Sequence, residues 1–267
     1  MCYPPSSRPP EIPSDLLRTA AGVPAISGGA GGADVVLTSE DGGRFRAYLT
    51  KADEGEAGVV VAPDVRGLHP FYEELAERFA SAGIHAIAFD YFGRTAGTER
   101  RPADWAYQEH NARNTTAQVM ADLTTAIGHL RGATDARSIY VMGFCKGGRV
   151  AFNAAAEHSG IAGTVGFYGW PTRRSDDDAS APIDSVDRMH LPLLGLFGAA
   201  DKAIPESAVE RFRQALAARG VRHHVHVYPG APHSFFDRTA DDWKAESEDA
   251  WRRVLGFVRT GDPAARA

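Results

Sequence analysis

Short apolar runs alternate with amphipathic helical segments through most of this chain, and this alternation limits its fold more than any other feature. Gly58–Ala62 is continuously apolar, as in a strand that is buried on both faces of a parallel sheet, and Ile84–Phe89 is predicted to be a second buried strand. Phe71–Ala82 has helical periodicity and is ended by Gly83. The pattern predicts an α/β fold with a mostly parallel central sheet and helices on both faces.

The same pattern extends over the rest of the chain. Ala33–Thr38 and Arg44–Thr50 are predicted to pair as a hairpin around a turn at residues 41–43. Trp170–His190 is irregular and is predicted to be a surface loop, with a lid beside the active site as the alternative. The remaining predicted strands are Ser138–Met142, Ile161–Phe167, Leu191–Phe197 and Arg222–Tyr228, and the remaining helices are Asn114–Leu130, Cys145–Glu157, Glu206–Arg219 and Asp241–Val258.

The length of 267 residues is enough for one α/β domain, which we assign to residues 33–267. Residues 1–32 are rich in Pro, Gly, Ser and Ala, and we expect a flexible or loosely docked leader there. The leader has no apolar core of the kind that a signal peptide carries. No run of about 18 apolar residues is present, so no membrane-spanning helix is expected.

Charge and cysteine usage narrow the function further. The formal net charge is -5 and the two signs are interspersed, which argues against a nucleic-acid partner. Cys2 and Cys145 are the only cysteines, so we expect no disulfide framework, and a reducing cytoplasm is the predicted location. The expected partner is a small-molecule substrate, with the protein a monomer or a homodimer, and no cofactor or metal is predicted.

The most informative segment joins a predicted strand to a predicted helix through a cysteine. Small residues two before and two after Cys145 allow a sharp turn, which leaves the thiol at the apex. A helix N-terminus at this point favours a thiolate. This is the layout of a nucleophile elbow, and the alternative is a buried, inert cysteine. The segment reads Ile139-Tyr140-Val141-Met142-Gly143-Phe144-Cys145-Lys146-Gly147-Gly148.

A nucleophile elbow predicts an acid and then a histidine later in the chain. Asp201 follows the predicted strand that ends at Phe197, and His233 follows the one that ends at Tyr228. In these roles His233 takes the thiol proton and Asp201 orients the imidazole. The oxyanion needs two backbone N–H donors, for which we predict Lys146, directly after the nucleophile, and Val65.

Other residues fit these roles less well. Asp184 and Asp187 precede the relevant strand instead of following it, which makes them weaker candidates for the acid. His224 and His226 share a face of the last predicted strand, near His223, but no carboxylate or cysteine is close in sequence to complete a metal site.

Taken together, these motifs resemble the dienelactone hydrolase family of α/β-hydrolases over roughly residues 33–260. The resemblance rests on the elbow, on Asp201 and on the Pro-His-Ser-Phe segment around His233. Two further motifs carry it, Ala62-Pro63-Asp64-Val65-Arg66-Gly67 and Phe89-Asp90-Tyr91-Phe92-Gly93-Arg94. It implies the α/β-hydrolase fold and a Cys-His-Asp triad.

The resemblance also implies roles for other residues. In the family a carboxylate after the third strand helps to deprotonate the cysteine; here that position holds Asp64, one methylene shorter than the Glu of the best-known member. Members acting on dienelactone hold the substrate carboxylate with arginines, and Arg94 falls on one such position. The second position holds Asp237, with Arg238 one residue later.

The predicted reaction is acyl transfer, in which Cys145 attacks an ester or lactone and water then hydrolyses the acyl-thioester. An enol-lactone substrate follows from the resemblance. The alternatives on the same scaffold are a general carboxylesterase, a redox-sensing thiol protein, a non-catalytic binding protein and a serine-type peptidase or lipase. We expect aromatic side chains near the strand ends to line the pocket, and the alternative is that they are ordinary core residues. These residues are Tyr91, Phe92, Phe144, Tyr168, Trp170, Phe235 and Phe236.

Overall fold

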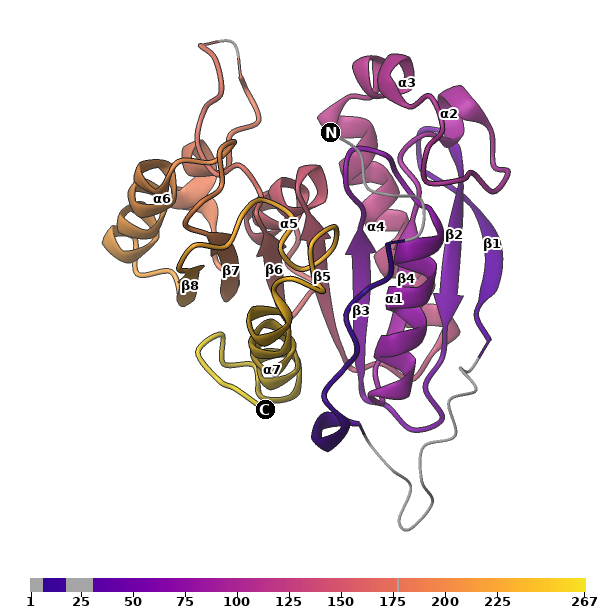
Figure 1. The fold of residues 1–267 in the computed structure, drawn as a ribbon. Helices are drawn as coiled ribbons and strands as arrows, with labels where there is room; N and C mark the ends of the chain where they lie inside the picture. Colours follow the sequence, from indigo (N-terminus) through magenta and orange to yellow (C-terminus); the bar gives the residue numbers. More distant parts are fainter. Residues whose placement is uncertain (1–6, 18–30, 177) are drawn as a thin grey trace. The chain divides into compact units, whose positions relative to one another are not determined.

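The computed structural model describes residues 7–17, 31–176 and 178–267, and it divides the chain into two compact units. The N-terminal unit comprises Met1–Val61 and Arg66–Ile139, and the C-terminal unit comprises Ala62–Val65 and Tyr140–Ala267. Each unit contains hydrogen-bonded strands with helices packed on them (Figure 1). The range predicted as a single domain therefore contains two compact units.

The described part of the N-terminal unit holds four strands in the order β1-β2-β4-β3. β1 and β2 form the predicted antiparallel hairpin, β2 is antiparallel to β4, and β3 is parallel to β4. Every residue of β4 is buried, as expected for a strand that is covered on both faces. The bounds are Ala33–Thr38 for β1, Arg44–Thr50 for β2, Ala57–Ala62 for β3 and His85–Phe89 for β4.

Helices α1 (Pro70–Ser81) and α4 (Thr116–Ala133) cover opposite faces of these strands (Figure 1). Pro70 opens α1, where its missing N–H costs nothing, and Thr115 and Gln118 form a reciprocal capping box at the start of α4. Two short helices, α2 (Gly93–Ala96) and α3 (Gln108–Arg113), were not predicted, because one or two turns are too short to show helical periodicity.

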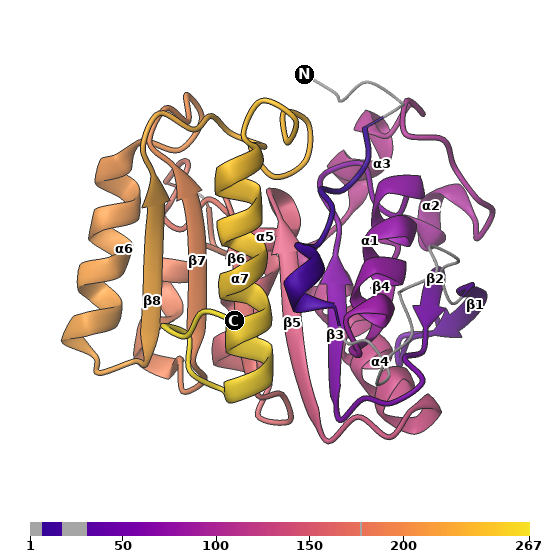
Figure 2. The same ribbon diagram turned by 60° about the horizontal axis from the view of Figure 1, so that its bottom comes forward.

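The C-terminal unit is a parallel array in the order β5-β6-β7-β8. Helix α7 covers one face, and α5 and α6 cover the other, where Phe152 packs on Phe212 at 5.2 Å between ring centroids (Figure 2). The strands are β5 (Ser138–Phe144), β6 (Gly163–Phe167), β7 (Leu193–Gly198) and β8 (His223–Tyr228), and the helices are α5 (Lys146–Glu157), α6 (Glu206–Ala218) and α7 (Lys244–Thr260).

Because these four strands are parallel, their carboxyl ends lie along one edge of the sheet, where α/β proteins place their ligand sites. Cys145 follows β5, and Tyr168 follows β6. Asp201 and His233 lie in the loops after β7 and β8. The topology of this one unit therefore gathers the predicted triad at a single edge.

Two irregular regions are partly described. In the predicted leader, Ile12 and Leu16 are buried, and Glu11 pairs with Arg78 of α1 at 2.8 Å, while residues 1–6 and 18–30 lie outside the described residues. The predicted loop from Trp170 to His190 contains a 3-10 helix, Pro182–Arg188. Among the helices that the structure describes, none combines the length and apolar character needed to cross a membrane.

Candidate active site

Cys145 stands at the apex of a sharp turn between β5 and α5. Its φ is 52°, a left-handed conformation that a residue with a side chain rarely adopts, and it directly precedes the first residue of α5. Its backbone N–H donates to the carbonyl of Phe167 at 3.0 Å, which ties the turn to the end of β6. A Cβ on Gly147 would lie 2.0 Å from the carbonyl oxygen of Ala62, so only glycine allows this approach. These features give the sharp strand–turn–helix geometry expected of a nucleophile elbow.

Backbone strain is concentrated around this turn. Within the described ranges, the non-glycine residues with positive φ are Cys145, Tyr168 and Ser234, at 52°, 37° and 65°. Tyr168 directly follows β6, and Ser234 directly follows His233. Strained conformations of this kind persist where the surroundings impose them, and they cluster at functional sites. The three positions therefore mark the same edge of the sheet as the predicted triad.

Asp201 and His233 are brought together by the loops after β7 and β8. Nδ1 of His233 lies 2.6 Å from Oδ2 of Asp201, while Oδ1 of Asp201 accepts the N–H groups of Ala203 and Ile204 at 2.7 and 3.0 Å. The acid side chain is only 1% exposed. A Cβ on Gly198 would come within 2.2 Å of the Ala231 carbonyl, so the two loops touch there. The carboxylate is thus held by its own turn and aimed at the imidazole.

The imidazole of His233 is held in its charged form. Burial alone would lower its pKa, but hydrogen bonds and electrostatic interactions with Asp201 and Cys145 raise the pKa to about 10. Since Nδ1 is engaged by Asp201, the bond with Cys145 uses Nε2. An imidazolium between a carboxylate and a thiol sulfur is the arrangement that favours a thiolate nucleophile.

The predicted oxyanion-hole residues lie on both sides of the elbow. Lys146 is the first residue of α5, where a backbone N–H has no acceptor within its own helix. The contact of Gly147 with the carbonyls of Ala62 and Pro63 brings the segment that carries Val65 to the same turn. The side chain of Lys146 is largely buried, and this desolvation lowers its pKa to about 8, opposed by the charge of Cys145.

Asp64 belongs to the same short segment and is 3% exposed. Burial of this carboxyl group beside the elbow is compatible with the role in thiol activation that the sequence predicts. That role stays a prediction.

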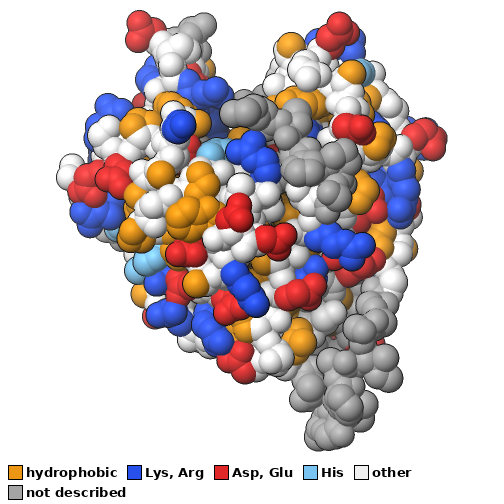
Figure 3. All heavy atoms as spheres, in the orientation of Figure 1, with side chains coloured by type: hydrophobic (Ala, Val, Ile, Leu, Met, Phe, Trp, Pro, Cys, Tyr) orange, Lys and Arg blue, Asp and Glu red, His pale blue; other side chains and the backbone are white. Residues whose placement is uncertain are grey.

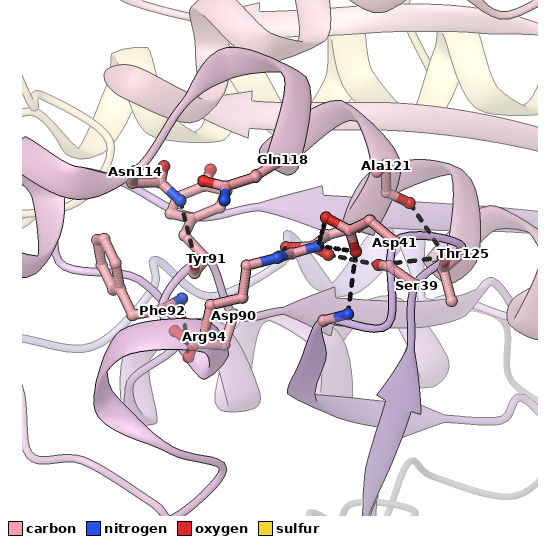
Figure 4. A network of polar contacts seen from close by, with 12 residues as sticks. Ser39, Asp41, Asp90, Tyr91, Phe92, Arg94, Asn114, Gln118, Ala121 and Thr125 are labelled. Atoms are coloured by element: carbon pink, nitrogen blue, oxygen red, sulfur yellow. Dashed lines mark hydrogen bonds and ion pairs between the residues drawn. The ribbon is translucent and has the colours of Figure 1, made fainter.

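Arg94, predicted to anchor a substrate carboxylate, is paired with two carboxylates of the N-terminal unit (Figure 4). Nη1 donates to Asp122 at 2.5 Å, and Nη2 donates to both oxygens of Asp41 at 2.7 and 2.9 Å. The Asp122 side chain is fully buried and also accepts the hydroxyl of Ser39. These contacts join the β1–β2 turn to α2 and α4, which favours a structural role for Arg94.

Most of the aromatic residues predicted to line the pocket are interior packing residues. Tyr91, Phe144 and Phe235 are at most 1% exposed, as in the core-packing alternative. Trp170 is half-buried, and the guanidinium of Arg174 lies 5.5 Å from the centre of its ring. Arg238 is half-buried as well. Among the residues predicted to bind substrate, Trp170 and Arg238 are therefore the ones, besides Arg94, that keep surface accessible to solvent.

Arg149, which the sequence did not single out, fastens the segment after β6 to the elbow helix. It donates to the carbonyl of Thr172 at 3.4 Å and to Ser180 Oγ at 3.1 Å, and it forms an ion pair with Asp178. Asn153, one turn further along α5, donates to the carbonyl of Ser180 at 3.0 Å. This part of the predicted loop is thus fixed to the helix that begins at the nucleophile. The sequence feature that could have pointed to this role is the position of Arg149, four residues after the elbow cysteine.

The histidines of β8 do not form a metal site. Nε2 of His224 accepts a hydrogen bond from Arg253 at 2.9 Å, and the rings of His226 and His224 are stacked with their centroids 6.1 Å apart. Burial, followed by the charge of Arg253, lowers the pKa of both histidines, that of His226 to about 4. Among the described residues, no group of three or more His, Cys, Asp or Glu side chains could hold a metal ion.

The charge distribution agrees with the sequence. Basic and acidic side chains of the described residues are interspersed over the face drawn in Figure 3. Cys2 lies outside the described residues, so the structure describes one thiol, that of Cys145.

Comparison with known proteins places this chain in a family. A sequence model of the dienelactone hydrolase family matches residues 45–261. A protein of Escherichia coli (strain K12) named "Putative carboxymethylenebutenolidase" is 32% identical over 209 residues, which cover 75% of this chain and 76% of that protein.

Solved structures share the fold. The crystal structure of a "Putative Dienelactone Hydrolase" from Klebsiella pneumoniae superposes with a TM-score of 0.74 at 28% identity, covering 86% of this chain and 98% of the other. The acylaminoacyl peptidase of Pyrococcus horikoshii, at 13% identity and a TM-score of 0.71, covers 87% of this chain and 42% of its own, and it shows the fold alone. The chain has the α/β-hydrolase fold, belongs to the dienelactone hydrolase family and is a carboxylic ester hydrolase of that type.

Proposed function

We propose that this hydrolase cleaves ester or lactone bonds through a Cys145-His233-Asp201 triad and an acyl-thioester intermediate. The observation that carries the proposal is the continuous chain of contacts from Asp201 through the charged imidazole of His233 to Cys145. Each member follows a different parallel strand, so the rigid sheet fixes their order and spacing.

The first half of the reaction forms the thioester. The thiolate of Cys145 attacks the carbonyl carbon, a C–S bond forms, and the carbonyl electron pair moves to oxygen. The N–H groups of Lys146 and Val65 would stabilise this oxyanion, and such donors are typically worth about 3–4 kcal/mol each. When the intermediate collapses, the C–O bond breaks and the leaving oxygen takes the proton held on Nε2 of His233.

The second half returns the enzyme to its resting state. His233, now neutral, takes a proton from water as the water oxygen attacks the thioester carbon. Collapse of this second intermediate breaks the C–S bond and releases a carboxylic acid product and the thiolate. Asp201 stays ionised and supports the imidazolium in both halves. In this proposal Asp64 assists the initial transfer of the thiol proton from Cys145 to His233 and takes no part in the later steps.

We propose a small-molecule ester or lactone as the substrate and place Trp170 and Arg238 at its binding site, since both retain accessible surface. The pairing of Arg94 with Asp122 and Asp41 favours substrates whose binding does not depend on Arg94. Two cysteines in 267 residues fit a reducing compartment, and we propose the cytoplasm.

The test compares hydrolysis of p-nitrophenyl acetate and of a small enol-lactone by the wild type, by Cys145→Ala and by Cys2→Ser. We expect Cys145→Ala to lose activity on both substrates by about 10³-fold or more, since removing a triad member has such effects. The matched control Cys2→Ser removes the other thiol and should keep the wild-type rate. Hydrolysis that survives in Cys145→Ala would contradict the proposal.

A further inference from the structure

Tyr168 combines burial, backbone strain and contact with the proposed general base. It directly follows β6, and its exposure is 0%. Its φ is 37°, in the left-handed region that bulky residues rarely occupy. A bulky residue keeps such a conformation only where its surroundings impose it, and such residues cluster at functional sites. The sequence had suggested only a pocket-lining aromatic residue at this position.

Backbone hydrogen bonds on both sides of Tyr168 connect its peptide bonds to Cys145 and to the strand that leads to Asp201. Its N–H donates to the carbonyl of Leu196 in β7 at 2.8 Å. The carbonyl of Phe167, in the peptide bond that precedes Tyr168, accepts the N–H of Cys145 at 3.0 Å. The strained peptide is therefore held between the nucleophile and the strand that leads to Asp201.

The side chain of Tyr168 contacts the loop of His233 at two points. Its ring centroid lies 4.9 Å from that of the His233 imidazole, with the planes inclined at 54°. Its hydroxyl donates to Oδ2 of Asp237 at 2.7 Å, and Asp237 is 2% exposed. The N–H of Asp237 donates in turn to the carbonyl of Ser234 at 3.2 Å. The tyrosine thus bridges the imidazole and a buried carboxylate four residues further along the same loop.

This contact supplies a restraint that the triad hydrogen bonds lack. The bonds of His233 with Asp201 and Cys145 use its two different ring nitrogens. They fix the axis between Nδ1 and Nε2, but they leave the imidazole able to rock about that axis. The ring of Tyr168, whose centroid lies 4.9 Å from that of the imidazole, limits that rotation, and the hydroxyl bond with Asp237 fixes the tyrosine ring itself.

We propose that Tyr168 is a positioning residue that holds the imidazole of His233 in line with Cys145, and that Asp237 acts through the hydroxyl of Tyr168. The inference rests on the proposed function of the triad and adds two residues to it. Neither residue donates a proton to the substrate or touches it in this assignment. Their effect is on the orientation of the base, which enters the rate of each proton transfer.

The test uses Tyr168→Phe, which keeps the ring and removes the hydroxyl, in a Cys2→Ser background. We expect kcat to fall about tenfold to a hundredfold, as for small misplacements of a catalytic group, with KM nearly unchanged. The second readout is the pH profile for alkylation of Cys145 by iodoacetamide, which needs no substrate. Its midpoint should move to higher pH, because a loosely held imidazolium stabilises the thiolate less.

Two further variants separate positioning from stability. Asp237→Asn keeps an oxygen that can accept the hydroxyl proton, so it should stay closer to the wild type in kcat than Asp237→Ala. Tyr228→Phe is the matched control, since Tyr228 is 3% exposed in the same unit and donates to Asp249 at 2.9 Å. It should lower Tm about as much as Tyr168→Phe and leave kcat and the alkylation profile unchanged.

The outcomes are distinct. The proposal is wrong if Tyr168→Phe keeps the wild-type kcat and alkylation profile, or if Tyr228→Phe changes both as much. Should Tyr168→Phe fold poorly, equal kcat values for Asp237→Asn and Asp237→Ala contradict the proposal instead. Failure of the underlying triad has a different signature, namely hydrolysis at the wild-type rate by Cys145→Ala.

Discussion

Oδ2 of Asp201 lies 2.6 Å from Nδ1 of His233, and the other oxygen of the same carboxylate is held by the N–H groups of Ala203 and Ile204. The acid therefore cannot turn away from the imidazole without breaking its own turn. This geometry places a proton on Nδ1 of His233, next to Asp201, and leaves Nε2 to interact with the thiol of Cys145.

Replacing Asp201 by Asn should remove the strongest contact that raises the pKa of His233. The pKa should fall from about 10, so that less imidazolium is present to stabilise the thiolate at neutral pH. We expect kcat to drop on the order of 10³–10⁴-fold, as for the same change in other triads, and Cys145 to react more slowly with iodoacetamide at pH 7. Rates measured from pH 5 to 10 give both results, and an unchanged alkylation profile would disprove the assigned role.

His226 should make the protein less stable in mild acid. Burial, with a smaller effect from the charge of Arg253, lowers its folded-state pKa to about 4, whereas an unfolded histidine titrates near 6.5. Between these values the unfolded chain binds more protons, so this contribution to stability is present above pH 6.5 and is lost as the pH falls through 4. Tm should therefore fall from pH 7 to pH 5.

The variant His226→Gln tests the source of that acid sensitivity. It should show a smaller fall in Tm over the same interval, because the group that titrates has been removed. His190→Gln is the control, since His190 is exposed, and it should follow the wild type. Equal pH dependence in His226→Gln and the wild type would show that another group is responsible.

Arg94→Met separates a structural role from substrate anchoring. It leaves the fully buried carboxylate of Asp122 without its ion-pair partner, and breaking a buried pair in this way typically costs about 3–5 kcal/mol. We expect urea unfolding to show a loss of this size, and the double variant Arg94→Met/Asp122→Leu to recover part of it. Unchanged stability with a raised KM for carboxylate-bearing lactones alone would instead support the anchoring role.

Gly128→Ala should stabilise the protein. Gly128 lies within α4, and a Cβ placed there would meet no atom within 4 Å. Alanine in a helix is favoured over glycine by roughly 0.5–1 kcal/mol. Gly147→Ala is the contrasting variant, since its Cβ would lie 2.0 Å from the Ala62 carbonyl. Thermal unfolding should give a higher Tm for the first and a much lower Tm for the second; two similar values would contradict the packing described at the elbow.

Local patterns made the strands predictable from the sequence and pointed to the residues that we propose as the triad. The continuously apolar run Gly58–Ala62 in β3 is buried at every residue, so its sequence needed no tertiary information to interpret. The spacing of glycines around Cys145 reflects backbone contacts that exclude any side chain. Chain order then limited the acid and the base to Asp201 and His233, because each must follow a later strand.

The contacts that the sequence did not reveal are made with distant partners. Arg94 meets Asp122 and Asp41, which lie 28 and 53 residues away, so its pairing leaves no local pattern. Tyr168 meets Asp237 across 69 residues, and its positive φ arises from contacts with other strands. A motif can mark where such residues lie, but only the folded chain shows which charges and hydroxyls they engage.

Trapping the acyl-enzyme tests the central claim most directly. The wild-type protein is mixed with p-nitrophenyl acetate, quenched in acid within the first turnover, digested and analysed by mass spectrometry. The account predicts an acetyl group on the peptide that contains Cys145, absent in Cys145→Ala and longer-lived in His233→Asn, where deacylation lacks its base. An acetyl group on another residue that forms and decays at the rate of turnover, with Cys145 unmodified, would contradict it.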